Sequence, residues 1–176
     1  MPTPRLYAGQ VVTADRWNTL VPTLVTQEND QIVTNSATYV DSEISFTPEP
    51  NAVYEYQLLI SYSATTAAGM KWSWDAPGAL MLSFTQLIDH PGTAGLSVGQ
   101  TVVFRRPANA TDRQAGGTDA TSPPANFHSA YDMGTFSTDG TISAVTLRFA
   151  QVVATAAHQT ILRGANQTRM LYKRIA

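Results

Sequence analysis

The chain has 176 residues, which is enough for one hydrophobic core and too few for a second independent one. It is 43% hydrophobic but only 14% charged, its formal net charge is −2, and its 11 basic residues are scattered along the sequence. Nucleic-acid binding requires clustered Lys and Arg, so this composition excludes it. The lack of cysteine excludes disulfides, thiolate catalysis and Cys-ligated metal sites.

No targeting or membrane segment is expected. Residues 1–20 lack the apolar core of a signal peptide, and no stretch approaches the roughly 20 apolar residues that span a bilayer. We therefore expect a chain that is neither exported through a signal peptide nor inserted into a membrane.

Residues 1–35 are expected to form an N-terminal arm. Thr13 can cap one short helix, and Pro22 cannot continue that helix, so it ends before the proline. The arm carries apolar side chains that need a surface to bury against, and we expect that surface to belong to a partner. These side chains are Leu6, Tyr7, Trp17 and Leu20.

From residue 36 onward the apolar residues alternate with polar ones, which is typical of strands with one buried face. The clearest strand is 53–62, where Tyr54, Leu58 and Tyr62 fall on one side. Further strands are expected at 70–74, 80–84, 100–104, 126–136, 141–154 and 170–175. Within 141–154, the predicted buried face consists of Val145, Leu147, Phe149 and Val153, and Asp139-Gly140 predicts a hairpin before it.

Short strands without helices for parallel crossovers predict an all-β fold. We expect residues 36–176 to form an antiparallel, jelly-roll-like β-sandwich, preceded by the arm with its short helix. Pro107–Asn126 has three Pro, two Gly and five Ala but no larger apolar side chain, which predicts a long structureless loop.

Catalytic and metal-binding patterns are missing from the sequence. His90, His128 and His158 lie about thirty residues apart without the spacing of a ligand set or a catalytic group. Most acidic residues stand in turns rather than as the paired carboxylates that glycoside hydrolysis needs. We therefore expect no enzymatic activity, no cofactor and no metal site.

Two small groups of residues have more than one interpretation. Trp72 and Trp74 alternate with polar residues, so they face the sandwich core or a subunit interface, or else form a sugar-stacking platform. Arg105-Arg106 is a compact positive spot, interpreted as a solvated loop edge with an anion site as the alternative.

Four segments resemble a family of small actinobacteriophage virion proteins. They are AGQVVTADRWN at 8–18, SATYVDSEISF at 36–46, PNAVYEYQLLISYSA at 50–64 and GMKWSWDAPGA at 69–79. The resemblance covers about half of the chain, and neither the 107–126 loop nor the C-terminal half takes part in it. It implies a trimeric, non-enzymatic β-domain on the phage particle, of the kind described as minor tail, fibre or head-decoration proteins.

The resemblance places the protein in the virion, made in the host bacterial cytoplasm and released by lysis. We expect a homotrimeric capsid-decoration or head-fibre protein, anchored through its arm to the major capsid protein or a tail protein. The alternative is a tail-fibre or minor tail protein that binds a host-surface glycan. A free lectin or glycan hydrolase is a more distant alternative.

Overall fold

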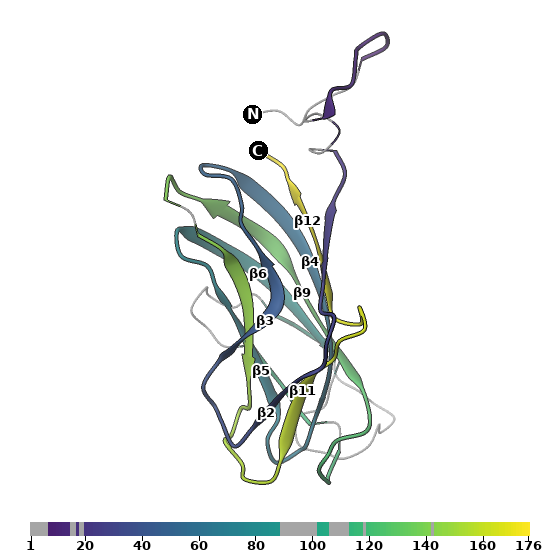
Figure 1. Ribbon diagram of the computed structural model, residues 1–176, viewed down its shortest axis with the longest axis vertical. Helices are drawn as coiled ribbons and strands as arrows, with labels where there is room; N and C mark the ends of the chain where they lie inside the picture. Colours follow the sequence, from purple (N-terminus) through teal and green to yellow (C-terminus); the bar gives the residue numbers. More distant parts are fainter. Residues whose placement is uncertain are drawn as a thin grey trace.

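Two antiparallel sheets packed face to face make up the sandwich in the computed structural model, which describes residues 7–14, 17, 20–88, 102–105, 113–117, 119–141 and 143–176 (Figure 1). The strands are β1 (Thr23–Thr26), β2 (Gln31–Thr34), β3 (Val40–Phe46), β4 (Val53–Ala64), β5 (Met70–Asp75), β6 (Ala79–Ile88), β7 (Val102–Arg105), β8 (Arg113–Ala115), β9 (His128–Thr138), β10 (Val145–Ala150), β11 (Gln159–Leu162) and β12 (Arg169–Arg174).

The strand order is that of a jelly roll. The smaller sheet has the order β3-β10-β5-β8, and the larger sheet contains the neighbours β4-β9-β6-β7. Strands β3, β4, β5 and β6 therefore alternate between the two sheets. In each sheet a strand from later in the sequence lies between two earlier ones: β10 lies between β3 and β5, and β9 lies between β4 and β6. Two interleaved Greek keys produce this arrangement. The predicted all-β, antiparallel, jelly-roll-like sandwich is confirmed.

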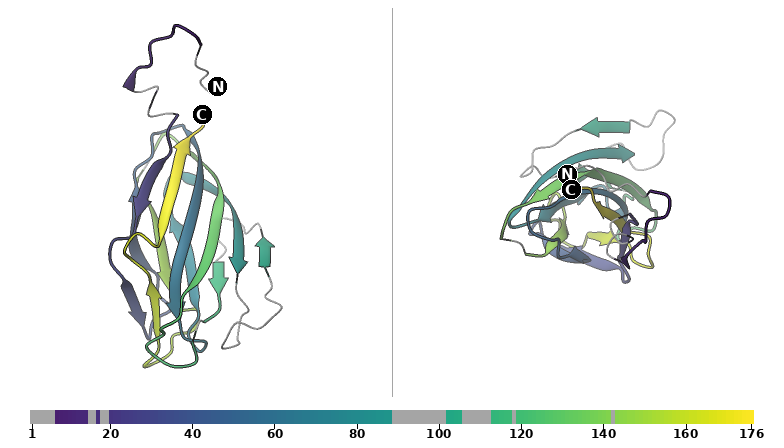
Figure 2. Two further views of the ribbon diagram at one scale, coloured as in Figure 1. Left: turned by 90° about the vertical axis from the view of Figure 1, so that its right-hand side faces the viewer. Right: turned by 90° about the horizontal axis from the view of Figure 1, so that it is seen from above.

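Four further strands widen the larger sheet beyond β4. Strand β12 pairs with β4 from Tyr54 to Leu59, and β11 pairs with it from Tyr62 to Ala64. Strand β1 then pairs with β12, and β2 pairs with β11. Seen from above, the two sheets enclose a single interior (Figure 2). The sequence placed 23–34 in the arm, whereas the structure places this segment in the sandwich, with Val33 in the core.

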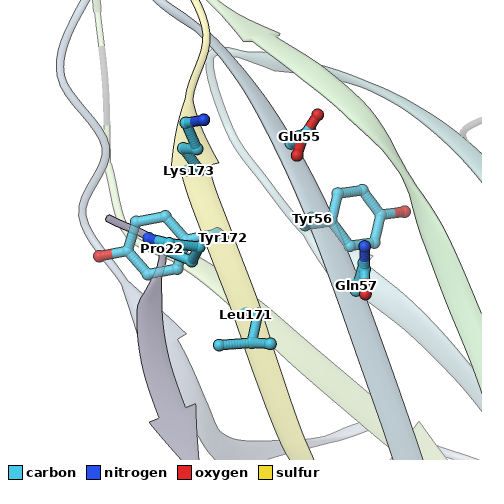
Figure 3. A pocket seen from close by; sticks show the side chains of 7 residues that line it. All are labelled: Pro22, Glu55, Tyr56, Gln57, Leu171, Tyr172 and Lys173. Atoms are coloured by element: carbon cyan, nitrogen blue, oxygen red, sulfur yellow. The ribbon is translucent and has the colours of Figure 1, made fainter. Parts of the chain in front are cut away.

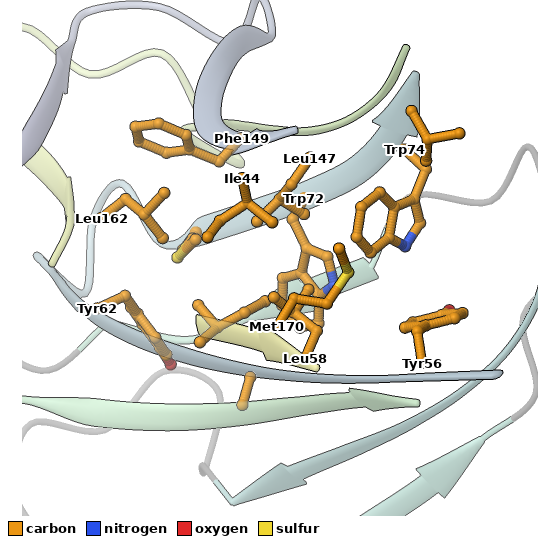
Figure 4. Close-up of a cluster of buried hydrophobic side chains, with 14 of the residues drawn as sticks. Ile44, Tyr56, Leu58, Tyr62, Trp72, Trp74, Leu147, Phe149, Leu162 and Met170 are labelled. Carbon is orange, nitrogen blue, oxygen red and sulfur yellow. The ribbon is translucent and has the colours of Figure 1, made fainter. Parts of the chain in front are cut away.

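The core lies between the sheets and follows the predicted alternation. Tyr56, Leu58 and Tyr62 point inward from β4 and face the inward side chains of the smaller sheet (Figure 4). In that sheet Leu147 stands beside Trp74 and Phe149 beside Trp72 in the strand register. Aromatic rings also pack at one end of the core, where Tyr54 stacks on Phe136 at 4.9 Å between centroids.

Two expectations near β10 are wrong. Asp139-Gly140 does not close a hairpin, because β9 belongs to the larger sheet and β10 to the smaller one. The link crosses from one sheet to the other instead. Val153 lies beyond the end of β10 and is exposed, whereas Val145, Leu147 and Phe149 are buried as predicted.

The predicted loop at 107–126 is not structureless throughout. Its residues 113–115 form β8, which pairs with β5 at the edge of the smaller sheet. The remainder that the structure describes, 116–117 and 119–126, contains a β-bridge between Asp119 and Thr65. The predicted short arm helix falls mostly outside the described residues, although the Trp17 amide donates to the Thr13 carbonyl at 2.9 Å.

Candidate attachment surface

The N-terminal segment projects beyond the end of the sandwich at which the C-terminal residue also lies (Figures 1 and 2). A short turn organises part of it, since the Gln10 amide donates to the Tyr7 carbonyl at 3.1 Å. Its apolar side chains remain open to solvent: Val11 is 82% exposed and Trp17 57% exposed. Exposed apolar groups gathered on one segment are typical of a surface that another protein covers.

The four predicted attachment residues differ in what the structure describes. Tyr7 and Trp17 are exposed, Leu20 is partly buried, and Leu6 lies outside the described residues. Strand β1 begins directly after Pro22, so the change from projecting segment to sandwich occurs at this proline.

A shallow hollow lies where the projecting segment joins the sandwich (Figure 3). Pro22 borders it, and β12 and β4 contribute Leu171, Lys173, Glu55 and Gln57. In the strand register Leu171 stands opposite Gln57 and Lys173 opposite Glu55. The hollow therefore combines an aliphatic side chain, an amide and one charge of each sign.

A buried polar cluster links the two sheets in the interior. Asp132 on β9 and Arg113 on β8 are fully buried, with 2.8 Å between the Arg113 Nε and the Asp132 Oδ2. The Tyr56 hydroxyl donates to Oδ1 at 3.0 Å, and the Trp72 indole nitrogen donates to Oδ2 at 3.1 Å. Four strands, β4, β5, β8 and β9, thus meet at one carboxylate.

Burial dominates the electrostatics of this cluster. Desolvation raises the pKa of Asp132, and the Arg113 guanidinium together with the indole and phenol donors opposes that rise. A buried carboxylate surrounded by a cation and two aromatic donors can hold neighbouring strands in one arrangement. Because this carboxylate is fully buried and both of its oxygens are engaged by Arg113, Tyr56 and Trp72, we assign the cluster a structural role.

The segment after β8 is also held closely against the sandwich. The Thr66 amide donates to the Asp119 carbonyl at 2.7 Å, and the Asn126 side chain donates to the Asp119 carboxylate at 2.7 Å. A Cβ atom on Gly117 would lie 2.2 Å from the Thr66 nitrogen, so only glycine fits there. Part of the predicted loop is therefore integral to the domain.

The remaining predicted site residues are not brought together. Trp72 and Trp74 are buried, so their interpretation as core residues is confirmed and the sugar-stacking platform is wrong. The backbone of Arg105, in β7, pairs with that of Thr85 in β6, and Arg106 lies outside the described residues.

Of the histidines, His158 contacts Thr65, with 3.0 Å between Nδ1 and Oγ1, and His128 packs against Tyr62. His90 is not among the described residues. In the part of the chain that the structure describes, no three His, Asp or Glu side chains gather as metal ligands. No helix there is long and apolar enough to cross a membrane.

Sequence reasoning missed Arg113 and Asp132. Arg113 stands in a segment of small and polar residues, where a single basic residue indicates solvent exposure. Asp132 does carry a signal, because it occupies the same strand face as Ala130 and Phe136, which alternation places in the core.

No protein-family model matches the chain, and no curated protein matches it. Solved structures with some likeness come from infectious bursal disease virus. The Gt strain structure has 12% sequence identity and a TM-score of 0.22, and the match covers 100% of this chain and 43% of that one. The VP2 subviral particle has 13% identity and a TM-score of 0.21, with 100% and 46% covered. The chain thus spans less than half the length of these proteins, and the scores are too low to carry over a function.

Proposed function

We propose that this chain is a non-enzymatic structural protein of a bacteriophage particle. It is a capsid-decoration or head-fibre protein that assembles as a homotrimer and is anchored by its N-terminal segment. The observation that carries the proposal is the projecting segment with exposed Tyr7, Val11 and Trp17 on a jelly-roll scaffold. The sequence resemblance at 8–18, 36–46, 50–64 and 69–79 supports the same assignment.

The division between segment and sandwich suits attachment. Burying a large apolar side chain stabilises a complex by roughly 1.5–3 kcal/mol before the cost of ordering, so a few such residues can anchor a small domain. Among the described residues, the buried core cluster begins at Val33, Val25 is partly buried against it, and Tyr7, Val11 and Trp17 do not belong to it. The segment is therefore available to the major capsid protein or to a tail protein.

The experiment compares attachment by the full chain and by a chain lacking residues 1–22. Both are mixed with particles that lack the protein, and the bound amount is measured after sedimentation. We expect the shortened chain to remain folded, because β1 begins at Thr23, and to lose attachment at least tenfold. Trp17→Ser in the full chain should weaken attachment, whereas Val153→Ser, an exposed valine at the opposite end, should not.

Equal attachment of the shortened and full chains would overturn the anchoring role. Cryo-electron microscopy of particles saturated with the full chain then locates the domain. Density on the head supports a decoration or head-fibre protein. Density on the tail would replace it with the minor tail alternative.

A further inference from the structure

Two exposed aromatic rings with a hydroxyl group between them lie on the outer face of the larger sheet, beside the first residues of β9. Phe127 directly precedes β9 and is 55% exposed, and Tyr131 on β9 is 37% exposed. The exposed Ser129 stands between them on the same face, because side chains alternate along a strand and His128 packs against the inward Tyr62. A rise of about 3.3 Å per residue places the two rings roughly 13 Å apart along the strand.

Arg163 holds the first of these rings in place. Its guanidinium carbon lies 4.5 Å from the centroid of the Phe127 ring, as in a cation–π contact. The guanidinium is itself held, since it donates to Asp30 at 2.8 Å, to the Ser63 hydroxyl at 2.8 Å and to the Pro124 carbonyl at 3.3 Å. A ring fixed in this way loses little conformational freedom when a ligand stacks on it.

Hydrogen-bonding groups border the two rings. Ser61 on β4 stands opposite Ser129 in the strand register, and its hydroxyl donates to the Gln167 Oε1 at 3.2 Å. This contact orients the exposed Gln167 amide, whose NH2 group is a hydrogen-bond donor. The surface therefore alternates flat apolar rings with hydroxyl and amide groups, whereas the centre of a protein–protein interface is a more continuous apolar patch.

We propose that this surface binds an oligosaccharide of uncharged pyranose rings. It consists of Ser61, Phe127, Ser129, Tyr131 and Gln167. A pyranose presents C–H groups on its faces and hydroxyls around its rim, so it stacks on an aromatic ring while its hydroxyls exchange hydrogen bonds with hydroxyl and amide groups. The separation of roughly 13 Å between the two rings requires several linked sugars rather than one.

Charge favours an uncharged sugar over an acidic one. The Arg163 guanidinium is neutralised by its ion pair with Asp30, and its remaining contacts to Ser63 occupy further donors. Arg169 lies at the border of the surface, where its guanidinium donates to the Asn166 carbonyl. These cations are engaged with groups of the protein itself, so they give an anionic ligand little advantage.

The surface lies at the end of the sandwich away from the projecting N-terminal segment (Figure 1). Val53 pairs with Ser137 near the end of β9, and the Val53 amide donates to the Ala176 carbonyl at 2.8 Å. The start of β9 is therefore far from the C-terminal residue and from the attachment segment. The inference goes beyond the proposed function, and only the outward orientation of the surface on a particle rests on it.

The test titrates the isotope-labelled full chain with cellohexaose, maltohexaose and chitohexaose, each up to about 10 mM, because two stacking rings support only millimolar affinity. At least one of these should shift the amide NMR signals of Ser129 and Tyr131. Phe127→Ala and Tyr131→Ala should each weaken binding at least tenfold, whereas Phe127→Trp, which keeps a flat ring, should retain it. Leu80→Ala, at a 56% exposed position near the other end of the same face, is the matched control and should bind as wild type does.

Absence of binding by all three hexasaccharides overturns the inference. Unchanged binding by Phe127→Ala and Tyr131→Ala variants that thermal unfolding shows to be folded also overturns it. Binding of an acidic oligogalacturonate in place of the uncharged sugars would overturn the choice of ligand class. The measurement uses no particles, so failure of this surface and failure of the anchoring segment are distinguishable.

Discussion

At the scale of single residues, the Asp132 carboxylate is fully buried and has partners on both of its oxygens. It sits in the interior with Arg113, and it accepts hydrogen bonds from Tyr56 and Trp72. A buried pair of this kind adds little stability compared with an apolar replacement, but breaking it is costly because one charge stays in a low-dielectric environment.

Asp132→Asn should therefore destabilise the fold. The substitution preserves the shape but removes the negative charge beside Arg113, and the expected loss is about 3–5 kcal/mol. Tyr56→Phe removes only one donor and should cost about 1 kcal/mol. Urea unfolding at pH 7 measures both, and an Asp132→Asn variant as stable as wild type would show that the ion pair is dispensable.

The hydrogen bonds that Glu43 accepts predict that the stability of the fold depends on pH. Its carboxylate accepts hydrogen bonds from the Asn29 side chain and from the amides of Glu28 and Asn29, which lower its pKa from 4.5. The folded state therefore favours the ionised form. The resulting stabilisation is complete above the unfolded pKa and is lost as the pH falls through the folded pKa.

Glu43→Gln should accordingly be less stable than wild type at pH 7. The difference between the two unfolding free energies should shrink as the pH falls below about 4.5, the value for the unfolded side chain. Urea titrations at several pH values between 3 and 7 provide the measurement. A difference that stays constant over this range would argue against a role for the Glu43 charge.

At the scale of elements, the four strands that extend the jelly roll come as two consecutive pairs, β1 with β2 and β11 with β12. A short link separates the two strands of each pair. The link between β1 and β2 lies against the link between β11 and β12, where the Ala165 amide donates to the Glu28 carbonyl at 2.8 Å. Gln27 is buried in the first link and donates to the Asn29 carbonyl at 2.9 Å. Its side-chain oxygen accepts from the Glu43 amide at 3.0 Å, which joins this link to β3 of the other sheet.

Gly164 permits this close approach of the two links. A Cβ atom there would lie 2.3 Å from the carbonyl carbon of Asn29, so Gly164→Ala must displace backbone. We expect it to destabilise the protein by about 1–3 kcal/mol. Gly140→Ala, where a Cβ would meet nothing within 4 Å, is the matched control and should change stability by less than about 0.5 kcal/mol. Equal unfolding midpoints for the two variants in urea would refute this account.

At the scale of the whole molecule, the sandwich begins at Thr23 rather than at residue 36. Strands β1 and β2 complete the larger sheet, and their hydrogen-bonding partners β12 and β11 lie at the other end of the sequence. The N-terminal and C-terminal parts of the chain thus stabilise each other.

Two deletions separate the projecting segment from the domain. Removing residues 1–22 should leave the melting temperature within a few degrees of the full chain. Removing residues 1–35 takes away β1, β2 and Val33, and should lower the melting temperature by roughly 10 °C or more. Calorimetry of both chains provides the test, and equal melting temperatures would mean that β1 and β2 contribute little.

The sequence alone determined the long strands and their buried faces, because alternation depends only on which side chains avoid water. It predicted the inward faces of β4, β5 and β10 and the all-β jelly-roll class. It did not reveal β1, β2 and β11, because each has four residues in which the two larger apolar side chains are adjacent rather than alternating.

Only the tertiary structure decided where distant segments meet. Arg113 and Asp132 are 19 positions apart and their pairing requires β8 and β9 to lie in different sheets, which no local pattern encodes. The exposed face of the larger sheet likewise depends on the order β1-β12-β4-β9-β6. Periodicity is a property of one segment, whereas a surface or a buried pair arises from the order in which the strands assemble.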